Sequence, residues 1–374
     1  MPEQRTIVDY VERTFASFSD LPVNEVDSLA FCQLAYLRIG ETFPDATTGE
    51  GRLLRDLFQA ENLERLYGGL RDPKPNARLI AAFASSPRFR EVRVCRYVND
   101  VDADRGIQFS ATCFLLPNGD AFVAFRGTDM TIVGWKEDFN LAVSYPVPAQ
   151  IESLAYLLEC AEATTGNLFV GGHSKGGNLA TYCSMNAPAE VHDRIVRVFD
   201  HDGPGFYEEV VESNAFVALI PKVSKTVPQL SVFGQLFETV PVMKVVQSNG
   251  IGTLMQHDPY TWLVDVENAS FVDRGKLDAA ADYGRRTLDD WLRSMDADER
   301  ERFIEAFFLV CSSGGATGFG EGEKVATPID AFKTIIGSDE KVRAALYDGF
   351  GKLLHAAANK GDAVSASLES KEAR

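Results

Sequence analysis

The chain has 374 residues, of which 45% are hydrophobic and 24% are charged, a composition typical of a globular protein with a large buried core. This length suffices for one large α/β domain with additions or for two ordinary domains. The net charge of -17 at pH 7 argues against a nucleic-acid partner and against an anionic membrane bound by charge alone.

The spacing of cysteines, histidines and apolar residues narrows the class of protein further. The six cysteines show no C-x-x-C spacing and most lie inside apolar runs, which predicts reduced, buried thiols. The five histidines lack the paired spacing of metal ligands, so no metal site is expected. No stretch has the length of a signal peptide or a transmembrane segment. We therefore expect a cytoplasmic protein without a metal or another cofactor.

The first part of the chain changes from a helical to a strand pattern. Apolar residues at helical spacing predict helices at residues 7–15, 24–37, 51–63 and 75–83. In the second of these helices Asn24 is a candidate N-cap, and Asp27 is given a solvent-facing or cap-like role. Alternating and apolar runs then predict strands at residues 92–98, 107–116 and 120–125.

The second part alternates helices with strands before it becomes helical. A helix is predicted at residues 148–164, and strands at 168–171, 195–199 and 243–247. Residues 214–242 are interpreted as a strand followed by an irregular or short-helical segment, a candidate lid. Helices are predicted at residues 277–295, 297–311, 328–336 and 341–358, and disorder is predicted after residue 361. The alternation predicts a mainly parallel sheet with helices on both faces.

Residues 168–180 read L-F-V-G-G-H-S-K-G-G-N-L-A and contain G-x-S-x-G between a buried strand and the start of a helix. This order is typical of a nucleophile elbow, in which a tight turn presents a serine. Gly172 and Gly176 are needed because a side chain at either position would collide with the neighbouring backbone. Ser174 is therefore the candidate nucleophile, in a strained conformation with its hydroxyl exposed above the sheet.

A serine hydroxyl needs a histidine to take its proton and a carboxylate to orient that histidine. In this kind of site the acid and then the histidine come later in the chain, each after a strand. His257 meets these requirements and is the candidate base. His201 also follows a strand, but it leaves no room for an acid before it. His173, beside the nucleophile, is given a packing role.

Three aspartates are candidates for the acid. Asp202 is preferred because the G-P-G sequence after it would hold its carboxylate in a sharp turn. Asp200, nearer the strand, and Asp258, beside the histidine, stay open as alternatives. Each of the three could instead cap a following helix.

The tetrahedral intermediate of acyl transfer carries an oxyanion, which needs preorganised N–H donors. One donor is predicted to be the backbone of Lys175, at the start of the helix after the nucleophile. The second is predicted at Thr128, in the loop after the strand at 120–125, where the hydroxyl would add a third donor.

Several motifs carry a resemblance to a known family. F-R-G-T at 125–128, W-x-x-D at 135–138 and G-H-S-x-G-G at 172–177 together resemble the class 3 lipases. With N-E-V-D, D-G-P-G-F and Q-H-D-P as well, residues 5–265 look more like a bacterial family of lipase-like α/β hydrolases of unknown physiological function. The resemblance implies an α/β-hydrolase fold whose R-G-T loop supplies an oxyanion donor. We expect a hydrolase domain over 1–270, N-terminal helices included, and a C-terminal helical extension packed on it over 271–374.

Two positions depart from the class 3 lipase pattern. Lys175 stands where those lipases usually carry leucine, which puts a cation beside the nucleophile and disfavours a purely lipophilic entrance. The segment S-K-T-V-P at 224–228 lacks the carboxylate that those enzymes usually carry there. Asp202 as the acid therefore rests on its position.

These residues together predict a serine hydrolase that cleaves a carboxylic ester or thioester of a small-molecule acyl substrate. Ser174 would be the nucleophile, His257 the base and Asp202 the residue that orients it. Two alternatives stay open. One is a non-catalytic protein that binds an acyl ligand or a partner on a hydrolase fold, which a missing acid would favour. The other is an acyltransferase, which differs only in the acceptor.

Overall fold

The computed structural model describes residues 4–68, 70, 73–237, 240–319 and 324–372, with side chains described as far as residue 358. The chain divides into two compact units. The first comprises Met1–Thr128 and Pro148–Asp278, and the second comprises Asp129–Val147 and Ala279–Arg374. The domain boundary expected after residue 270 stays a prediction.

The first unit is built on a sheet whose eight described strands lie side by side in chain order, β1 to β8. Strands β1 to β4 pair antiparallel, and β4 to β8 pair parallel. The strands are β1 (Arg52–Leu53), β2 (Arg93–Asp102), β3 (Ile107–Leu115), β4 (Ala121–Phe125), β5 (Leu168–His173), β6 (Ile195–His201), β7 (Val223–Pro228) and β8 (Met243–Val246). The predicted mainly parallel sheet is confirmed.

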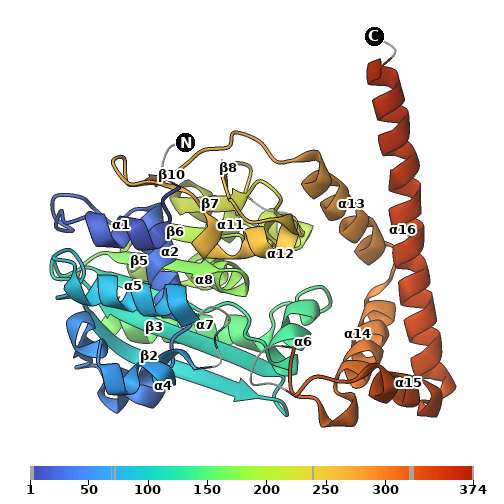
Figure 1. The fold of residues 1–374 in the computed structure, drawn as a ribbon, viewed down its shortest axis with the longest axis horizontal. Coiled ribbons are helices and arrows are strands. Elements are labelled where there is room, and N and C mark those ends of the chain that lie inside the picture. Colours follow the sequence, from blue (N-terminus) through green and yellow to red (C-terminus); the bar gives the residue numbers. More distant parts are fainter. Residues whose placement is uncertain (1–3, 69, 71–72, 238–239, 320–323, 373–374) are drawn as a thin grey trace. The chain divides into compact units, whose positions relative to one another are not determined.

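Helices cover both faces of this sheet (Figure 1). Side chains of a strand point alternately to opposite faces, and in β4 Phe122 and Ala124 enter one core while Ala121, Val123 and Phe125 enter another. The helices of this unit are α1 (Ile7–Arg13), α2 (Glu25–Leu34), α3 (Ile39–Thr42), α4 (Leu63–Tyr67), α5 (Pro73–Ser85), α7 (Pro148–Glu162), α8 (Lys175–Asn186), α9 (Ala189–His192), α10 (Glu208–Val211), α11 (Asn214–Leu219) and α12 (Gly252–His257). Residues of α1, α2 and α5 line the first core, and residues of α7 and α8 line the second. A separate pair of short strands is formed by β9 (Val264–Asp265) and β10 (Ser270–Phe271).

Helix α2 begins with the predicted cap. The Asn24 side chain accepts hydrogen bonds from the backbone N–H groups of Val26 and Asp27, at 2.9 and 3.1 Å. The Asp27 carboxylate in turn accepts from the Asn24 N–H at 3.1 Å, and it pairs with Arg88 at 2.6 Å, with both side chains fully buried. The cap-like role of Asp27 is confirmed. The solvent-facing role is wrong, because Arg88 supplies a counter-charge inside the protein.

The helix predicted over residues 51–63 is wrong. Arg52–Leu53 form β1, which pairs with β2, and short 3-10 helices follow at Leu54–Leu57 and Ala60–Asn62. Leu54 and Leu57 are both buried, and their spacing of three suits a 3-10 turn as well as an α-helix. Pairing with β2, which is a tertiary contact, decides the structure of this segment.

The strand expected in residues 214–242 does not lie at the start of this segment. Asn214–Leu219 form α11, where the Ser213 hydroxyl caps the helix by accepting from the Phe216 N–H at 3.2 Å. The strand is β7, and a short 3-10 helix follows at Phe233–Gln235. Residues 238–239 lie outside the described residues, and the lid stays a prediction.

The second unit is helical, with a core of its own. Its helices are α6 (Ile132–Asn140), α13 (Ala279–Arg293), α14 (Ala297–Cys311), α15 (Pro328–Gly337) and α16 (Glu340–Glu372). The indole N–H of Trp291 in α13 donates to the carbonyl of Gly349 in α16 at 2.8 Å. A Cβ at Gly349 would lie 2.1 Å from the Phe303 ring of α14, so glycine lets these helices approach closely. The tail after residue 361, for which disorder is predicted, is placed in α16 as far as Glu372, and residues 373–374 lie outside the described residues.

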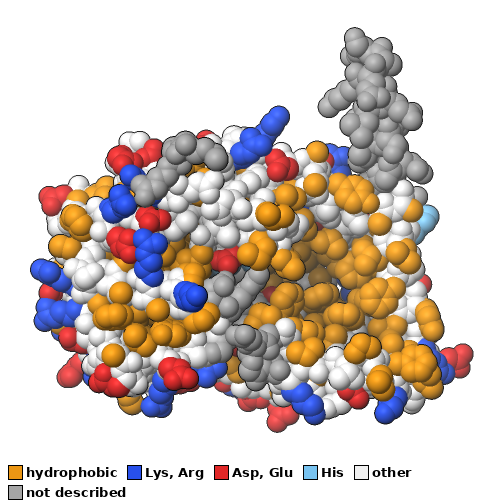
Figure 2. Space-filling view, viewed as in Figure 1, with side chains coloured by type: hydrophobic (Ala, Val, Ile, Leu, Met, Phe, Trp, Pro, Cys, Tyr) orange, Lys and Arg blue, Asp and Glu red, His pale blue; other side chains and the backbone are white. Residues whose placement is uncertain are grey.

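Exposed apolar side chains gather on the second unit (Figure 2). On α15, Ile329, Phe332 and Ile336 recur at helical spacing and are each at least 60% exposed. Within the part of the chain that the structure describes, no helix combines the length and the apolar content needed to cross a membrane.

The thiols are free and largely inside the protein. Cys32, Cys95, Cys113, Cys160 and Cys183 are buried, and Cys311 is half-buried. Burial raises the pKa of the Cys32 thiol above its usual range, which keeps it protonated and unreactive. The predicted burial is confirmed for these five cysteines, and their reduced state stays a prediction.

Candidate active site

Ser174 lies in a strained turn between β5 and α8. Its φ is 58° and its ψ is -133°, a conformation that is rare for a residue with a side chain. A Cβ at Gly172 would lie 2.0 Å from the Gly176 carbonyl carbon, and one at Gly176 would lie 2.2 Å from the Phe125 oxygen. The predicted need for glycine at both positions is therefore confirmed. The Ser174 N–H donates to the His201 carbonyl at 2.9 Å, which fixes the turn to β6.

Asp202 and His257 lie together although 55 residues separate them. Asp202 directly follows β6, and His257 is the last residue of α12. The imidazole Nδ1 is 2.6 Å from Asp202 Oδ2. The Asp202 side chain is fully buried, whereas that of His257 is 20% exposed. One ring nitrogen of His257 therefore faces a carboxylate inside the protein, in the geometry of an acid that orients a base.

The Asp202 carboxylate is held by more than the histidine. The Ser231 hydroxyl donates to Oδ1, and the Asp202 N–H donates to the Thr226 carbonyl of β7 at 2.8 Å. A Cβ at Gly234 would lie 2.2 Å from Oδ1, so only glycine leaves room for the carboxylate. These contacts fix both oxygens before any substrate binds.

The two alternative acids have other partners. Asp200 Oδ2 lies 2.7 Å from the Lys225 ammonium, and Oδ1 accepts from the Gly203 N–H at 2.9 Å. Burial raises the pKa of Asp200, although the neighbouring Lys225 opposes this. The Asp258 carboxylate accepts from the Tyr260 N–H at 3.0 Å and caps a short 3-10 helix. The structure thus brings Asp202 to His257 and directs Asp200 elsewhere.

His201, the competing histidine, lies in the core. Its Nε2 is 2.9 Å from the Ser28 hydroxyl, and its Nδ1 is 2.6 Å from the Thr226 hydroxyl. It is fully buried, and burial lowers the pKa of His201 to about 3. The imidazole is therefore neutral near pH 7 and joins α2 to β7.

The loop expected to bind the oxyanion passes beside the nucleophile. A Cβ at Gly127 would lie 3.0 Å from Ser174 Cβ and 2.6 Å from the His173 carbonyl oxygen. Glycine therefore lets the R-G-T loop approach the elbow, and Thr128 is the next residue. The backbone N–H of Lys175 is at the N-terminus of α8.

The Lys175 side chain lies elsewhere than the sequence suggests. It is 1% exposed, and its ammonium donates to the backbone oxygen and the side-chain oxygen of Gln108 in β3, at 2.8 and 2.7 Å. The expectation of a cation at the entrance beside the nucleophile is therefore wrong. The aliphatic chain of Lys175 is directed into the protein, where Gln108 of β3 supplies oxygen acceptors for the ammonium.

Sequence reasoning did not single out Tyr36, Ser231 or Lys225. Lys225 had a usable signal, because a charge within a short strand indicates a buried partner. Tyr36 and Ser231 had none, since the residues that they contact, His173 and Asp202, are far away in the sequence.

The hydrogen bonds of the described residues join His257 to Asp202 and do not include one from the Ser174 hydroxyl to His257.

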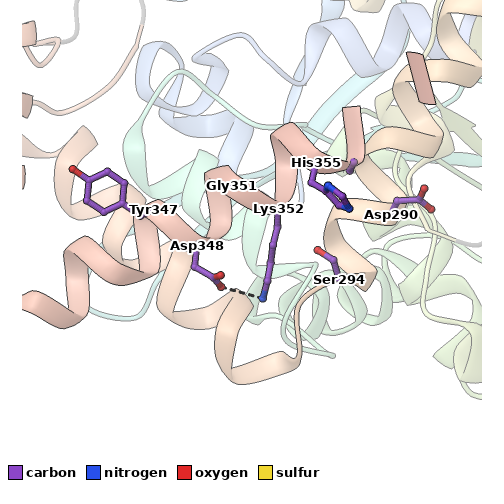
Figure 3. Close-up of a pocket in the computed structure, with 8 residues that line it drawn as sticks. Asp290, Ser294, Tyr347, Asp348, Gly351, Lys352 and His355 are labelled. Atoms are coloured by element: carbon purple, nitrogen blue, oxygen red, sulfur yellow. Dashed lines mark ion pairs between the residues drawn. The ribbon is translucent and has the colours of Figure 1, made fainter. Parts of the chain in front are cut away.

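A separate cavity of about 460 Å³ lies within the second unit (Figure 3). It is lined by Asp290 of α13, by Ser294 just after that helix, and by Tyr347, Asp348, Gly351, Lys352, His355 and Ala356 of α16. The Lys352 ammonium pairs with Asp348 at 3.0 Å and with Glu299 at 2.9 Å. None of the residues expected in the site lines this cavity.

Within the described residues, no group of three or more His, Cys, Asp or Glu side chains is arranged to hold a metal.

The mainly parallel sheet, its flanking helices and the turn at Ser174 define an α/β-hydrolase fold. Residues 83–309, more than half of the chain, match the model of the Mbeg1-like family. The chain belongs to this family.

Solved structures show a distant likeness. The chain is similar to the M37 lipase, at 15% identity and a TM-score of 0.37, over 57% of this chain and 70% of that one. It is also similar to the Rhizomucor miehei lipase in its propeptide complex, at 14% identity and a TM-score of 0.32, over 56% of this chain and 69% of that one. No curated protein is similar enough to the chain to count as a match.

Proposed function

We propose that this protein is a serine hydrolase that cleaves a carboxylic ester or thioester through an acyl-enzyme on Ser174. The observation that carries the proposal is the 2.6 Å contact between His257 Nδ1 and the buried Asp202 carboxylate. A strained serine precedes this pair in the chain order expected of an α/β hydrolase.

Each residue has a defined task in the proposed reaction. Ser174 Oγ attacks the carbonyl carbon while His257 Nε2 takes the hydroxyl proton. Asp202 accepts from Nδ1–H, which leaves Nε2 free to act as a base, and it stabilises the imidazolium that forms. His257 then gives the proton to the leaving alcohol or thiol. Water activated by the same imidazole releases the acyl group.

The negative charge that develops on the carbonyl oxygen needs donors that are already in place. We assign these donors to the backbone N–H groups of Lys175 and Thr128, with the Thr128 hydroxyl as a third. The close approach of Gly127 to Ser174 supports this assignment, because it puts the start of the loop in contact with the nucleophile.

Labelling with a fluorophosphonate probe tests the proposal, since such probes phosphonylate only an activated serine. The wild-type protein should be labelled, and Ser174→Ala should not be. Ser184→Ala is a matched control, because Ser184 is a buried serine of α8; this variant should be labelled like the wild type. Undiminished labelling of Ser174→Ala would overturn the proposal.

Activity on short p-nitrophenyl esters adds a kinetic test. Ser174→Ala should lower kcat by more than about a thousandfold, because it removes the hydroxyl that forms the proposed acyl-enzyme. The non-catalytic alternative depended on a missing acid, and Asp202 occupies that position in our proposal. The acyltransferase alternative predicts that added alcohols or amines capture the acyl group in preference to water.

A further inference from the structure

The main chain at His257 is held by two aromatic N–H groups. Helix α12 ends at His257, and the last carbonyls of a helix have no partner within the helix. The Gln256 carbonyl accepts from Trp262 Nε1 at 2.7 Å, and the His257 carbonyl lies 2.8 Å from His173 Nε2. Trp262 is fully buried and His173 is 5% exposed. Both carbonyls are therefore bound inside the protein.

The partners of His173 determine where its proton lies. A carbonyl oxygen can only accept, so Nε2 of His173 carries the hydrogen. Nδ1 is then an acceptor, and the Tyr36 hydroxyl, 3.3 Å away, donates to it. Burial is the main cause that lowers the pKa of His173 well below its usual range, and the nearby His257 adds to the effect. His173 is thus a neutral imidazole with a fixed tautomer.

Backbone and side chain of His257 are consequently fixed from two sides. Asp202 holds the imidazole through Nδ1, whereas His173 holds the carbonyl of the same residue. The centroids of the two imidazole rings lie 4.6 Å apart, and the interplanar angle is 37°. The His173 ring therefore also limits where the His257 ring can move. Because His173 is joined directly to Ser174 in the chain, it links the position of the base to that of the nucleophile.

We propose that His173 is a positioning residue, whose Nε2–H donates to the His257 carbonyl and keeps the base aligned between Ser174 and Asp202. This inference rests on the proposed function and assigns His173 a task beyond packing. It predicts that kcat depends more on an N–H group at the place of His173 Nε2 than on the size or polarity of the side chain at position 173.

Two amide substitutions separate these effects. In His173→Gln the side-chain nitrogen can occupy the place of Nε2, whereas in His173→Asn it falls near the place of Nδ1. His173→Gln should stay within about fivefold of the wild-type kcat. His173→Asn should lower kcat roughly 10- to 100-fold with KM nearly unchanged, since misplacing a catalytic group by about 1 Å has effects of this size. Equal activity of the two variants would overturn the proposal.

A spectroscopic measurement makes the test independent of turnover. The Nδ1 proton of His257, bound to Asp202, should give a low-field proton resonance in the wild type and in His173→Gln. In His173→Asn this resonance should broaden or disappear, because His257 is no longer held. A sharp resonance in both variants would contradict the inference. Absent fluorophosphonate labelling of the wild type would instead contradict the proposed function, so the two failures are distinguishable.

Discussion

At the scale of single residues, Asp202 combines strain with burial. Its φ is 55°, a conformation that costs a residue with a side chain roughly 1–2 kcal/mol. Contacts to Ser231, Thr226 and His257 hold it there. Because the backbone and both carboxylate oxygens are engaged, the side chain is aimed at the imidazole before substrate binds. In the proposed reaction this arrangement keeps the His257 proton on Nδ1.

Replacing this carboxylate tests its proposed task. We expect Asp202→Asn to lower kcat by roughly four orders of magnitude, because an amide can donate to Nδ1 and so force the wrong tautomer. Steady-state kinetics on a short ester, with circular dichroism to check folding, would measure this. Asp258→Asn serves as the control and should change kcat by less than about fivefold. A similar loss in both variants would argue against Asp202 as the acid.

A second residue-scale prediction concerns pH and the buried His201. Its pKa is about 3 in the folded protein and about 6.5 when unfolded. Between these values the unfolded state binds a proton that the folded state does not, so protonation of His201 lowers the free energy of unfolding as the pH drops from about 6.5 towards 3. His201→Gln should make this fall shallower by at most about 1.4 kcal/mol per pH unit. Urea unfolding at several pH values would measure the slopes, and identical slopes would contradict the prediction.

At the scale of elements, β6 and β7 are joined by an ion pair just before the acid. Lys225 of β7 lies 2.7 Å from Asp200 of β6, and it also donates to the Gly203 carbonyl at 2.6 Å. Both side chains are at most 7% exposed. Neighbouring parallel strands thus bring a buried cation to the turn that contains Asp202, and this contact fixes the turn on both sides of the acid.

Replacing one partner of this ion pair should lower the free energy of unfolding more than replacing both partners. Lys225→Met leaves a buried carboxylate without its counter-charge and should lower the free energy of unfolding by about 3–5 kcal/mol. The double variant Asp200→Asn, Lys225→Met should recover a large part of that loss, because no unpaired charge is left. Chemical denaturation of the four proteins of the cycle measures the coupling. Purely additive effects would show that the pair contributes no coupling energy.

At the scale of the whole molecule, two compact units share one chain. The second unit takes residues Asp129–Val147 from between β4 and α7, and the rest from Ala279 onwards. Thr128, a proposed oxyanion donor, is the last residue before the chain enters the second unit. The first unit contains two hydrophobic cores, and the second unit contains a third. Substitutions in one core should therefore act mainly on the stability of that unit.

A substitution of Trp291 tests whether the two units differ in stability independently of each other. Its ring packs edge-on against Phe303 at 5.4 Å, and its N–H bonds to Gly349. Trp291→Ala should destabilise the second unit by about 3–5 kcal/mol, and hydrogen exchange should rise in α13 to α16 but not in β4 to β6. Leu29→Ala, in the core of the first unit, should give the reverse pattern. Equal protection losses throughout both units would contradict the prediction.

The sequence alone was sufficient for features that depend on neighbours in the chain. The turn at Ser174 could be predicted because Gly172 and Gly176 are needed within a few residues of it. The cap at Asn24 depends on the two residues that bond to it, and β2 to β6 coincide with alternating or apolar runs of the sequence. Chain order also favoured His257 over His201 as the candidate base, since the expected order of acid and base is itself a property of sequence.

Only the tertiary structure decided which carboxylate meets His257, because Asp200, Asp202 and Asp258 all suit the local pattern. Asp200 contacts Lys225 of β7 and Asp202 contacts Ser231, which lie 25 and 29 residues away in the chain, whereas Asp258 accepts from Tyr260, two residues away. The direction of Lys175 and the contact of Tyr36 with His173 were equally inaccessible, since β3 and the residues after α2 reach the elbow only in the folded protein. The contact of His173 with a carbonyl 84 residues away has the same cause. Local sequence specifies backbone conformation, whereas long-range packing chooses the partner of each polar side chain.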